Sequence, residues 1–226
     1  MKLLCALAIL FYNSLVLNAQ KDSLVLLNEA KTKLQNKTTS VSDILTDKKY
    51  LSIHPLTEFR EMIKVNSDAG ILKITTPEEP GKKIRVLGTV SGKDGKPVAG
   101  VLVYLYQTDA KGWYAADAPH VLQNDGDTRH ARLFGYVKTD SKGKFELHTV
   151  KPCGYPSSDL PAHIHVHVSA TGYDGFVNEF LFDDDERLVG NIREQSVRNK
   201  FLISKPEKAI PPFVQQFSYT ITLNKE

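Results

Sequence analysis

Three histidines alternate with β-branched residues in the segment His163-Ile164-His165-Val166-His167-Val168. Residues two apart on a strand share one face and lie about 6.5 Å apart, so we expect the three imidazoles to point the same way. Two neighbouring imidazoles can reach one metal ion, each at about 2 Å, whereas three would span about 13 Å. The pattern therefore favours a metal site built on two histidines, against three unrelated histidines on a sheet surface.

Two tyrosines stand in loops that a sandwich fold can bring near this strand. Tyr114 follows a turn at Gly112, and Tyr155 lies eight positions before His163. Phenolate is a hard anionic donor that favours a highly charged ion, while imidazole suits several transition metals. Two phenolates with two imidazoles point to ferric iron rather than zinc. Taken singly, each tyrosine also fits a core or rim aromatic, and zinc on two histidines plus another ligand stays open.

Short strands at regular spacing, separated by glycine-containing turns, make up the second part of the chain. This spacing predicts an all-β sandwich. Lys93-Asp94-Gly95-Lys96 and Asp140-Ser141-Lys142-Gly143 are typical turns between paired strands. The expected strands are residues 84–90, 101–106, 134–138, 144–149, 163–168, 176–182 and 217–223.

The first part of the chain has a different character. Lys2 and the apolar run from Leu3 to Leu17 predict a signal peptide over residues 1–19, and a retained membrane anchor is the alternative. Helical spacing then predicts an N-terminal helical extension and linker over residues 20–75, with one helix after Pro55. These helices could pack on the main domain, form a homodimer, or only space the domain from its exit point, and we expect packing. Residues 76–226 form the predicted β-sandwich domain.

The composition narrows the function classes. The chain has 226 residues and a formal net charge of +3, with its basic residues scattered, so we expect no nucleic-acid partner. We expect export to the periplasm or outside the cell, with no stable membrane span. Removal of residues 1–19 leaves Cys153 as the only cysteine, which excludes an intramolecular disulfide.

The turn pattern around Gly95-Lys96-Pro97-Val98-Ala99-Gly100 and Thr139-Asp140-Ser141-Lys142-Gly143 resembles the prealbumin-like modules attached to carboxypeptidases. Physically it requires only tight turns, with glycine where φ is positive. Such modules carry no chemistry. A prealbumin-like binding module that keeps the fold, with or without a metal, is therefore the alternative to an enzyme.

The histidine strand and its surroundings are similar to a specific family, the intradiol ring-cleaving dioxygenases. The resemblance rests on Pro161-Ala162-His163-Ile164-His165, on Pro152, Tyr155 and Pro156, and on Gln107-Thr108-Asp109 with Gly112 and Tyr114. The later Glu179-Phe180-Leu181-Phe182-Asp183-Asp184-Asp185 also resembles the strand and acidic turn of the family. The likeness covers roughly residues 84–223.

This resemblance implies a function. His163, His165, Tyr114 and Tyr155 would bind one Fe(III), with a small aromatic diol and dioxygen as substrates. Tyr155 would also act as departing ligand and base, and the ring would open between its two hydroxyl-bearing carbons. His167 is not a ligand in the family, so an outer contact or simple exposure is expected for it.

One residue departs from the family pattern. An arginine usually precedes the Pro-Ala-His-Ile-His run and stabilises negative charge on the reacting substrate, whereas this chain has Leu160. Loss of one charge partner typically costs about 3–4 kcal/mol of transition-state stabilisation. The candidate replacements for the family arginine are Arg129 and Arg132, both in the loop before Phe134. We assign Arg132 to the catalytic site.

Overall fold

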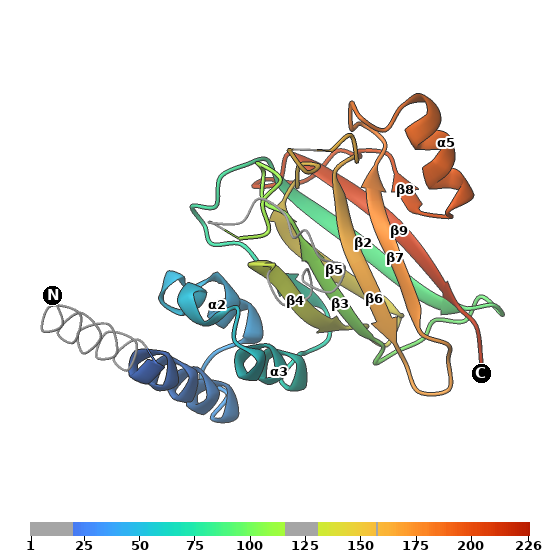
Figure 1. Ribbon diagram of the computed structural model, residues 1–226. Coiled ribbons are helices and arrows are strands. Elements are labelled where there is room, and N and C mark those ends of the chain that lie inside the picture. Colours follow the sequence, from blue (N-terminus) through green and yellow to red (C-terminus); the bar gives the residue numbers. More distant parts are fainter. Residues whose placement is uncertain (1–19, 116–130, 157) are drawn as a thin grey trace, which may run out of the picture.

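A computed structural model describes residues 20–115, 131–156 and 158–226. In these ranges the chain forms two sheets that face each other (Figure 1). One sheet has the order β1-β5-β2-β9 and the other the order β4-β3-β6-β7-β8. The strands are β1 (Ile71–Lys73), β2 (Lys83–Gly92), β3 (Leu102–Gln107), β4 (Leu133–Lys138), β5 (Lys144–Val150), β6 (His163–Ser169), β7 (Phe176–Phe182), β8 (Leu202–Ser204) and β9 (Gln215–Leu223). The predicted β-sandwich is confirmed.

Alternation of apolar and polar residues produces the sandwich. Along β9 the side chains of Phe217, Tyr219, Ile221 and Leu223 are buried and those between them are exposed. Strand β2 alternates in the same way, and it runs parallel to β9 and antiparallel to β5. Burial of one face of each sheet against the other supplies the core, because apolar surface is removed from water on both.

Helices flank the sandwich at two places (Figure 1). Near the N-terminus lie a helix over residues 20–35, α2 (Val41–Thr46), the 3-10 helix η1 (Lys48–Ile53) and α3 (Thr57–Val65). Near the C-terminus, α5 (Gly190–Arg198) lies beside β8. The boundary at residues 75/76 stays a prediction, although β1 already pairs with β5 before it.

The N-terminal helices dock on the sandwich through buried polar and aromatic groups. Arg60 of α3 donates hydrogen bonds to the carbonyl of Ala131 and the hydroxyl of Tyr104, and its guanidinium lies 3.8 Å from the centroid of the Phe134 ring. His54 stacks on Phe59 and donates from Nδ1 to the carbonyl of Arg132 at 3.0 Å. These contacts fasten the helices to the start of β4.

We predict that Gly88→Ala destabilises the fold by about 1–3 kcal/mol, the usual cost of overpacking a filled core. Gly88 of β2 lies opposite Phe145 of β5, and a Cβ atom there would meet the Phe145 ring at 2.1 Å. Denaturant unfolding of both proteins measures the difference. The matched control is Gly175→Ala, where no heavy atom lies within 4 Å of the added carbon, and we expect its stability to stay within about 0.5 kcal/mol of wild type.

We also predict an acid-sensitive contribution from His54. Burial lowers the pKa of His54 from 6.5 to about 4, so the folded protein holds this imidazole neutral. Between these values the unfolded chain binds a proton that the folded chain does not, and stability is lost as the pH falls from 6.5 to 4. The loss attributable to His54 is about 3 kcal/mol. Between pH 6.5 and 4 the free energy of unfolding should fall less for His54→Phe than for wild type. If both proteins showed the same pH profile, the assignment to His54 would be contradicted.

Candidate metal centre

Strand β6 supplies the two histidines of the site. It pairs with β3 on one side and β7 on the other, so His163 and His165 are held in a central strand. Their Nε2 atoms lie 3.1 Å apart. The Nδ1 of His163 donates to the carbonyl of Pro161 at 2.8 Å, which places the proton on Nδ1 and leaves Nε2 free to bind a metal.

A turn after β3 positions Tyr114. Asp109 accepts hydrogen bonds from the backbone N–H groups of Lys111 and Trp113 through Oδ1, and its own N–H donates to the carbonyl of Trp113. The backbone N–H of Arg132 donates to the carbonyl of Tyr114 at 2.7 Å and ties the end of this turn to β4. The Tyr114 side chain is buried, and its hydroxyl lies 2.9 Å from Nε2 of His165.

A second loop positions Tyr155 just before β6. The Arg187 guanidinium donates from one nitrogen to the carbonyls of Tyr155 and Ser158, both at 3.1 Å, and lies 3.4 Å from the carbonyl of Leu160. Asp185 accepts from the N–H groups of Ala162 and Arg187. The hydroxyl of Tyr155 then lies 3.2 Å from Nε2 of His163.

The two tyrosine loops are fastened to each other. The hydroxyl of Thr108 donates to the carbonyl of Cys153 at 2.7 Å, and the N–H of Cys153 donates to the carbonyl of Asp109 at 3.0 Å. Gly112 has φ +85°, and a Cβ atom there would lie 2.4 Å from the carbonyl oxygen of Gly154. Only glycine permits this approach. As a result the hydroxyls of Tyr114 and Tyr155 lie 2.6 Å apart.

Four ligand atoms therefore form a closed ring with neighbouring distances of 2.6 to 3.2 Å. Ligand atoms that bind one ion at about 2 Å lie about 2.8–3.4 Å apart when their bonds make angles between a right angle and the tetrahedral angle. Three of the four distances lie in this range, and the two tyrosine oxygens, at 2.6 Å, are closer than this. A ring of hydrogen bonds between these atoms would need four protons, whereas the two phenols supply two and the His163 proton points away. The donor set fits a hard cation, and the residues are the four that the sequence predicted for Fe(III).

Burial keeps the second histidine of the pair neutral. The pKa of His165 is lowered to about 2 by burial first and by the neighbouring His163 and His167 second. A neutral imidazole is the form that binds a metal. The ring of His165 also stacks on Tyr106, with centroids 4.4 Å apart and planes at 11°. This stacking fixes the direction of Nε2.

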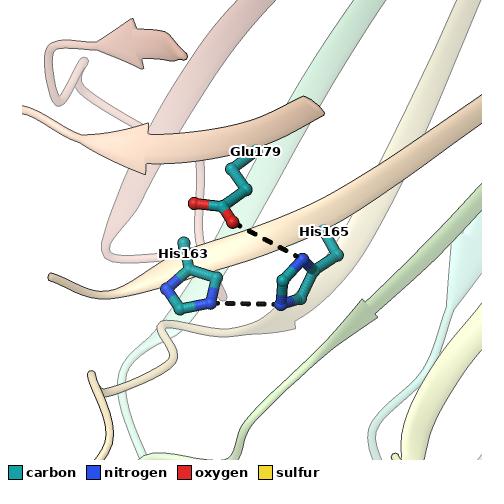
Figure 2. Close-up of side chains that lie close together, drawn as sticks. All are labelled: His163, His165 and Glu179. Carbon is teal, nitrogen blue, oxygen red and sulfur yellow. Dashed lines mark hydrogen bonds and ion pairs between the residues drawn. The ribbon is translucent and has the colours of Figure 1, made fainter. Parts of the chain in front are cut away.

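Glu179 approaches the other nitrogen of His165. It lies on β7 directly opposite His165 in the strand register, and its Oε1 lies 3.8 Å from Nδ1 of His165 (Figure 2). His163, His165 and Glu179 also form a group of side chains that could hold a metal. Because Glu179 faces Nδ1 while both Nε2 atoms face the tyrosines, we assign it to orienting His165. A metal-bound histidine usually donates its other ring N–H to a carboxylate, a backbone carbonyl or a water, and Glu179 is a carboxylate on that side of His165, at ion-pair distance.

The remaining predicted residues lie elsewhere. The Arg132 guanidinium makes two hydrogen bonds of 2.7 Å to Glu79 and lies 3.9 Å from a carboxylate oxygen of Asp109. Its assignment to the reacting centre stays a prediction. Arg129 lies outside the described residues. His167 contacts the ring edges of Tyr104 and Tyr106, which agrees with an outer position.

Sequence reasoning missed the roles of Glu179 and Arg187. Glu179 stood in a quoted motif, but only the β6–β7 register reveals that it faces His165. Arg187 follows the acidic turn in a loop without periodicity, so its contacts with the Tyr155 loop left no pattern in the sequence.

Comparison with known proteins agrees with this geometry. Residues 58–225, well over half of the chain, match the family described as Dioxygenase. Catechol 1,2-dioxygenase 1 of Acinetobacter lwoffii is 29% identical over 164 residues, which cover 65% of this chain and 48% of that protein. The protocatechuate 3,4-dioxygenase alpha chain of Pseudomonas putida is 31% identical over 146 residues, which cover 59% of this chain and 68% of that protein.

Solved structures show the same fold. Catechol 1,2-dioxygenase from Acinetobacter sp. ADP1 aligns with a TM-score of 0.57 at 18% identity, over 70% of this chain and 58% of that one. The dioxygenase domain of a carbohydrate-binding fusion protein from Streptomyces sp. SirexAA-E aligns with a TM-score of 0.53 at 24% identity. The alignment covers 71% of this chain and 90% of that domain. The chain spans about half the length of several curated relatives that it matches. By its sequence match and its fold, the chain belongs to the intradiol ring-cleavage dioxygenase family.

Proposed function

We propose that this protein is a non-haem ferric dioxygenase of the intradiol type, which opens the ring of a catechol-like diol with dioxygen. The observation that carries the proposal is the convergence of the Tyr114 and Tyr155 hydroxyls with Nε2 of His163 and His165. Ferric iron, when bound, would supply the Lewis acidity that favours the deprotonated form of the diol, which is electron-rich enough to react with dioxygen.

The residues around the ligand ring have distinct roles in the proposed function. Tyr114, His163 and His165 are buried or partly buried, and they hold the ligand atoms in fixed directions. Tyr155 is partly buried and lies in a loop, so its Oη is suited to accept a proton from the incoming diol as that diol binds. Tyr106 and Glu179 hold the His165 ring from its face and its far nitrogen.

A binding module without ring cleavage is the second candidate. Leu160 favours it, because this side chain replaces the family arginine and is 50% exposed without a charge to offer. Under this alternative the four ligands would still hold a metal. Ring-cleaving activity, rather than metal binding, separates the binding module from the dioxygenase.

Location and assembly belong to the same proposal. We propose export directed by residues 1–19, which lie outside the described residues, and a homodimer formed through the N-terminal helices. Within the described ranges, no helix has both the length and the apolar character to cross a membrane.

The first prediction of this proposal concerns colour and turnover. Protein reconstituted with ferric iron should show a visible tyrosinate charge-transfer band and consume oxygen with catechol. Tyr155→Phe should alter the band and reduce turnover about 100-fold or more, because it removes both a ligand and a base. Tyr136→Phe is the control: Tyr136 stacks on Tyr104, outside the ligand ring, and its band should match wild type.

Two results would decide against the enzyme. A preparation that stays colourless after reconstitution would remove the ferric centre from the proposal. A coloured protein that consumes no oxygen with any diol in a catechol panel would favour the binding module.

The second prediction concerns Glu179. Glu179→Leu should weaken ferric iron binding about 10- to 100-fold, the usual effect of removing the outer partner of a ligand histidine. Glu179→Gln keeps an oxygen acceptor for Nδ1 of His165 and should retain most of the affinity. Competition with a chelator measures both. Equal affinities for wild type and Glu179→Leu would show that Glu179 does not orient His165.

A further inference from the structure

A row of stacked rings leads away from the metal centre across three neighbouring strands. The ring of Tyr106 on β3 stacks on that of His165 on β6, with centroids 4.4 Å apart. Tyr104, two residues earlier on β3 and on the same face, stacks on Tyr106 with centroids 5.2 Å apart. Tyr136 of β4 lies opposite Tyr104 in the strand register and stacks on it, with centroids 4.5 Å apart. The tyrosine row, Tyr106-Tyr104-Tyr136, therefore connects a predicted metal ligand to the edge strand of this sheet (Figure 1).

The far end of the tyrosine row is open to small molecules. Tyr106 and Tyr104 are 5% and 7% exposed, whereas Tyr136 is only partly buried. Tyr136 forms part of the wall of a cavity of about 240 Å³, to which Asp68 and Lys73 bring polar side chains. A cavity of about 150 Å³ holds one benzene molecule, so a single ring fits beside Tyr136. The polar side chains can bond to a hydroxyl on that ring.

Packing alone does not require tyrosine at these positions. Phenylalanine stacks in the same way, and it brings no hydroxyl into a buried site, where a hydroxyl costs free energy unless it is bonded. Tyr104 meets this requirement through Arg60 of α3, whose Nη1 donates to the Tyr104 hydroxyl at 3.3 Å. What a phenol adds to the stack is redox chemistry, because it can give up one electron and its proton and become a neutral radical.

We propose that the tyrosine row carries single electrons from a phenol bound beside Tyr136 to the ferric centre, so that the protein reduces a hydroperoxide at the expense of that phenol. The inference rests on the ferric centre of the proposed function and adds a second activity to it. Non-haem iron takes part in one-electron chemistry, and rings in stacking contact divide the path to the surface into short steps.

Electrons and protons balance over two equal steps. In each step one electron passes along the row to the centre, while the phenol of Tyr136 releases its proton to water and becomes a neutral radical. A phenol in the cavity then returns one electron and one proton to Tyr136. Two electrons and two protons break the O–O bond of the hydroperoxide and give one alcohol and one water. Two phenols therefore become two phenoxyl radicals for each hydroperoxide consumed.

The test exposes the full chain, reconstituted with ferric iron, to tert-butyl hydroperoxide in the absence of a diol. A nitroso spin trap followed by peptide mass spectrometry should find the trapped radical on Tyr136, and iron-free protein should give no such adduct. Addition of 4-methoxyphenol should suppress the adduct and consume two phenols for each hydroperoxide. A radical found only on Tyr114 and Tyr155, or an equal adduct without iron, would overturn the proposal.

Two substitutions locate the path. Tyr104→Phe keeps the stacking but removes the phenol between Tyr106 and Tyr136, so the Tyr136 adduct should fall to the level of the iron-free protein. Tyr136→Phe removes the end of the row, and consumption of 4-methoxyphenol should fall to that same level. The matched control is Tyr173→Phe, which removes a partly buried phenol outside the row and should behave as wild type. Wild-type phenol consumption by Tyr136→Phe would contradict the path.

The visible band separates this inference from the function on which it rests. All three variants should keep the band of wild type, because none of them removes a metal ligand, and a changed band would reveal a disturbed centre. Absence of the band in wild type would end both proposals. A normal band with oxygen uptake on catechol, but no radical on Tyr136, would overturn the tyrosine row alone and leave the ferric dioxygenase in place.

Discussion

The site depends on one geometric constraint: a single strand can bring only two imidazoles to one ion. Side chains two apart on β6 share a face, and those of His163 and His165 turn their Nε2 atoms to within 3.1 Å of each other. His167, the next on that face, lies against Tyr104 and Tyr106 instead. The remaining ligands must therefore come from other segments. The two loops that carry Tyr114 and Tyr155 are therefore brought to the start of β6 by the rest of the fold.

Those loops are held by polar bonds and by small residues rather than by apolar burial alone. Gly112 and Gly154 allow backbone to approach backbone where any Cβ atom would collide, and Arg187 binds three carbonyls of the Tyr155 loop. Thr108 adds a bond from one loop to the other. These contacts hold the loops that carry both tyrosine oxygens, and ligands held by such supporting contacts favour affinity for an ion.

The sequence predicted the parts of the molecule that follow a local period. The seven expected strands are present with ends shifted by at most two residues, because alternation reports burial on a sheet directly. Strands β1 and β8 have three residues each, too few for a period to be seen. Helix α5 has Ser196 as its buried residue, so it carries no apolar stripe.

The residues of the candidate site fall into the same two groups, those that a local period predicts and those that it does not. The histidine pair could be predicted from alternation, since both ligands lie on one strand. The two tyrosines needed the family resemblance, because no local pattern places a loop tyrosine near a strand far from it in sequence. Glu179 required the register between β6 and β7, and Arg187 required the path of an irregular loop. Contacts between distant segments are set by tertiary structure, which spacing along one segment does not encode.

Leu160 stands where the family resemblance implies an arginine, so any positive charge at the approach to β6 comes from other residues. The charge of Arg132 is offset by Glu79 and Asp109, and its assignment to the reacting centre stays a prediction. Arg187 differs: within the described residues no carboxylate pairs with its guanidinium, and its three acceptors are neutral carbonyls, one of them that of Tyr155. A guanidinium bound only to neutral groups keeps its full field, and that field favours negative charge on nearby atoms. In this chain Arg187 carries its positive charge at the approach to β6 and braces the tyrosine loop through backbone carbonyls. Under the proposed function, its field would favour the phenolate form of Tyr155.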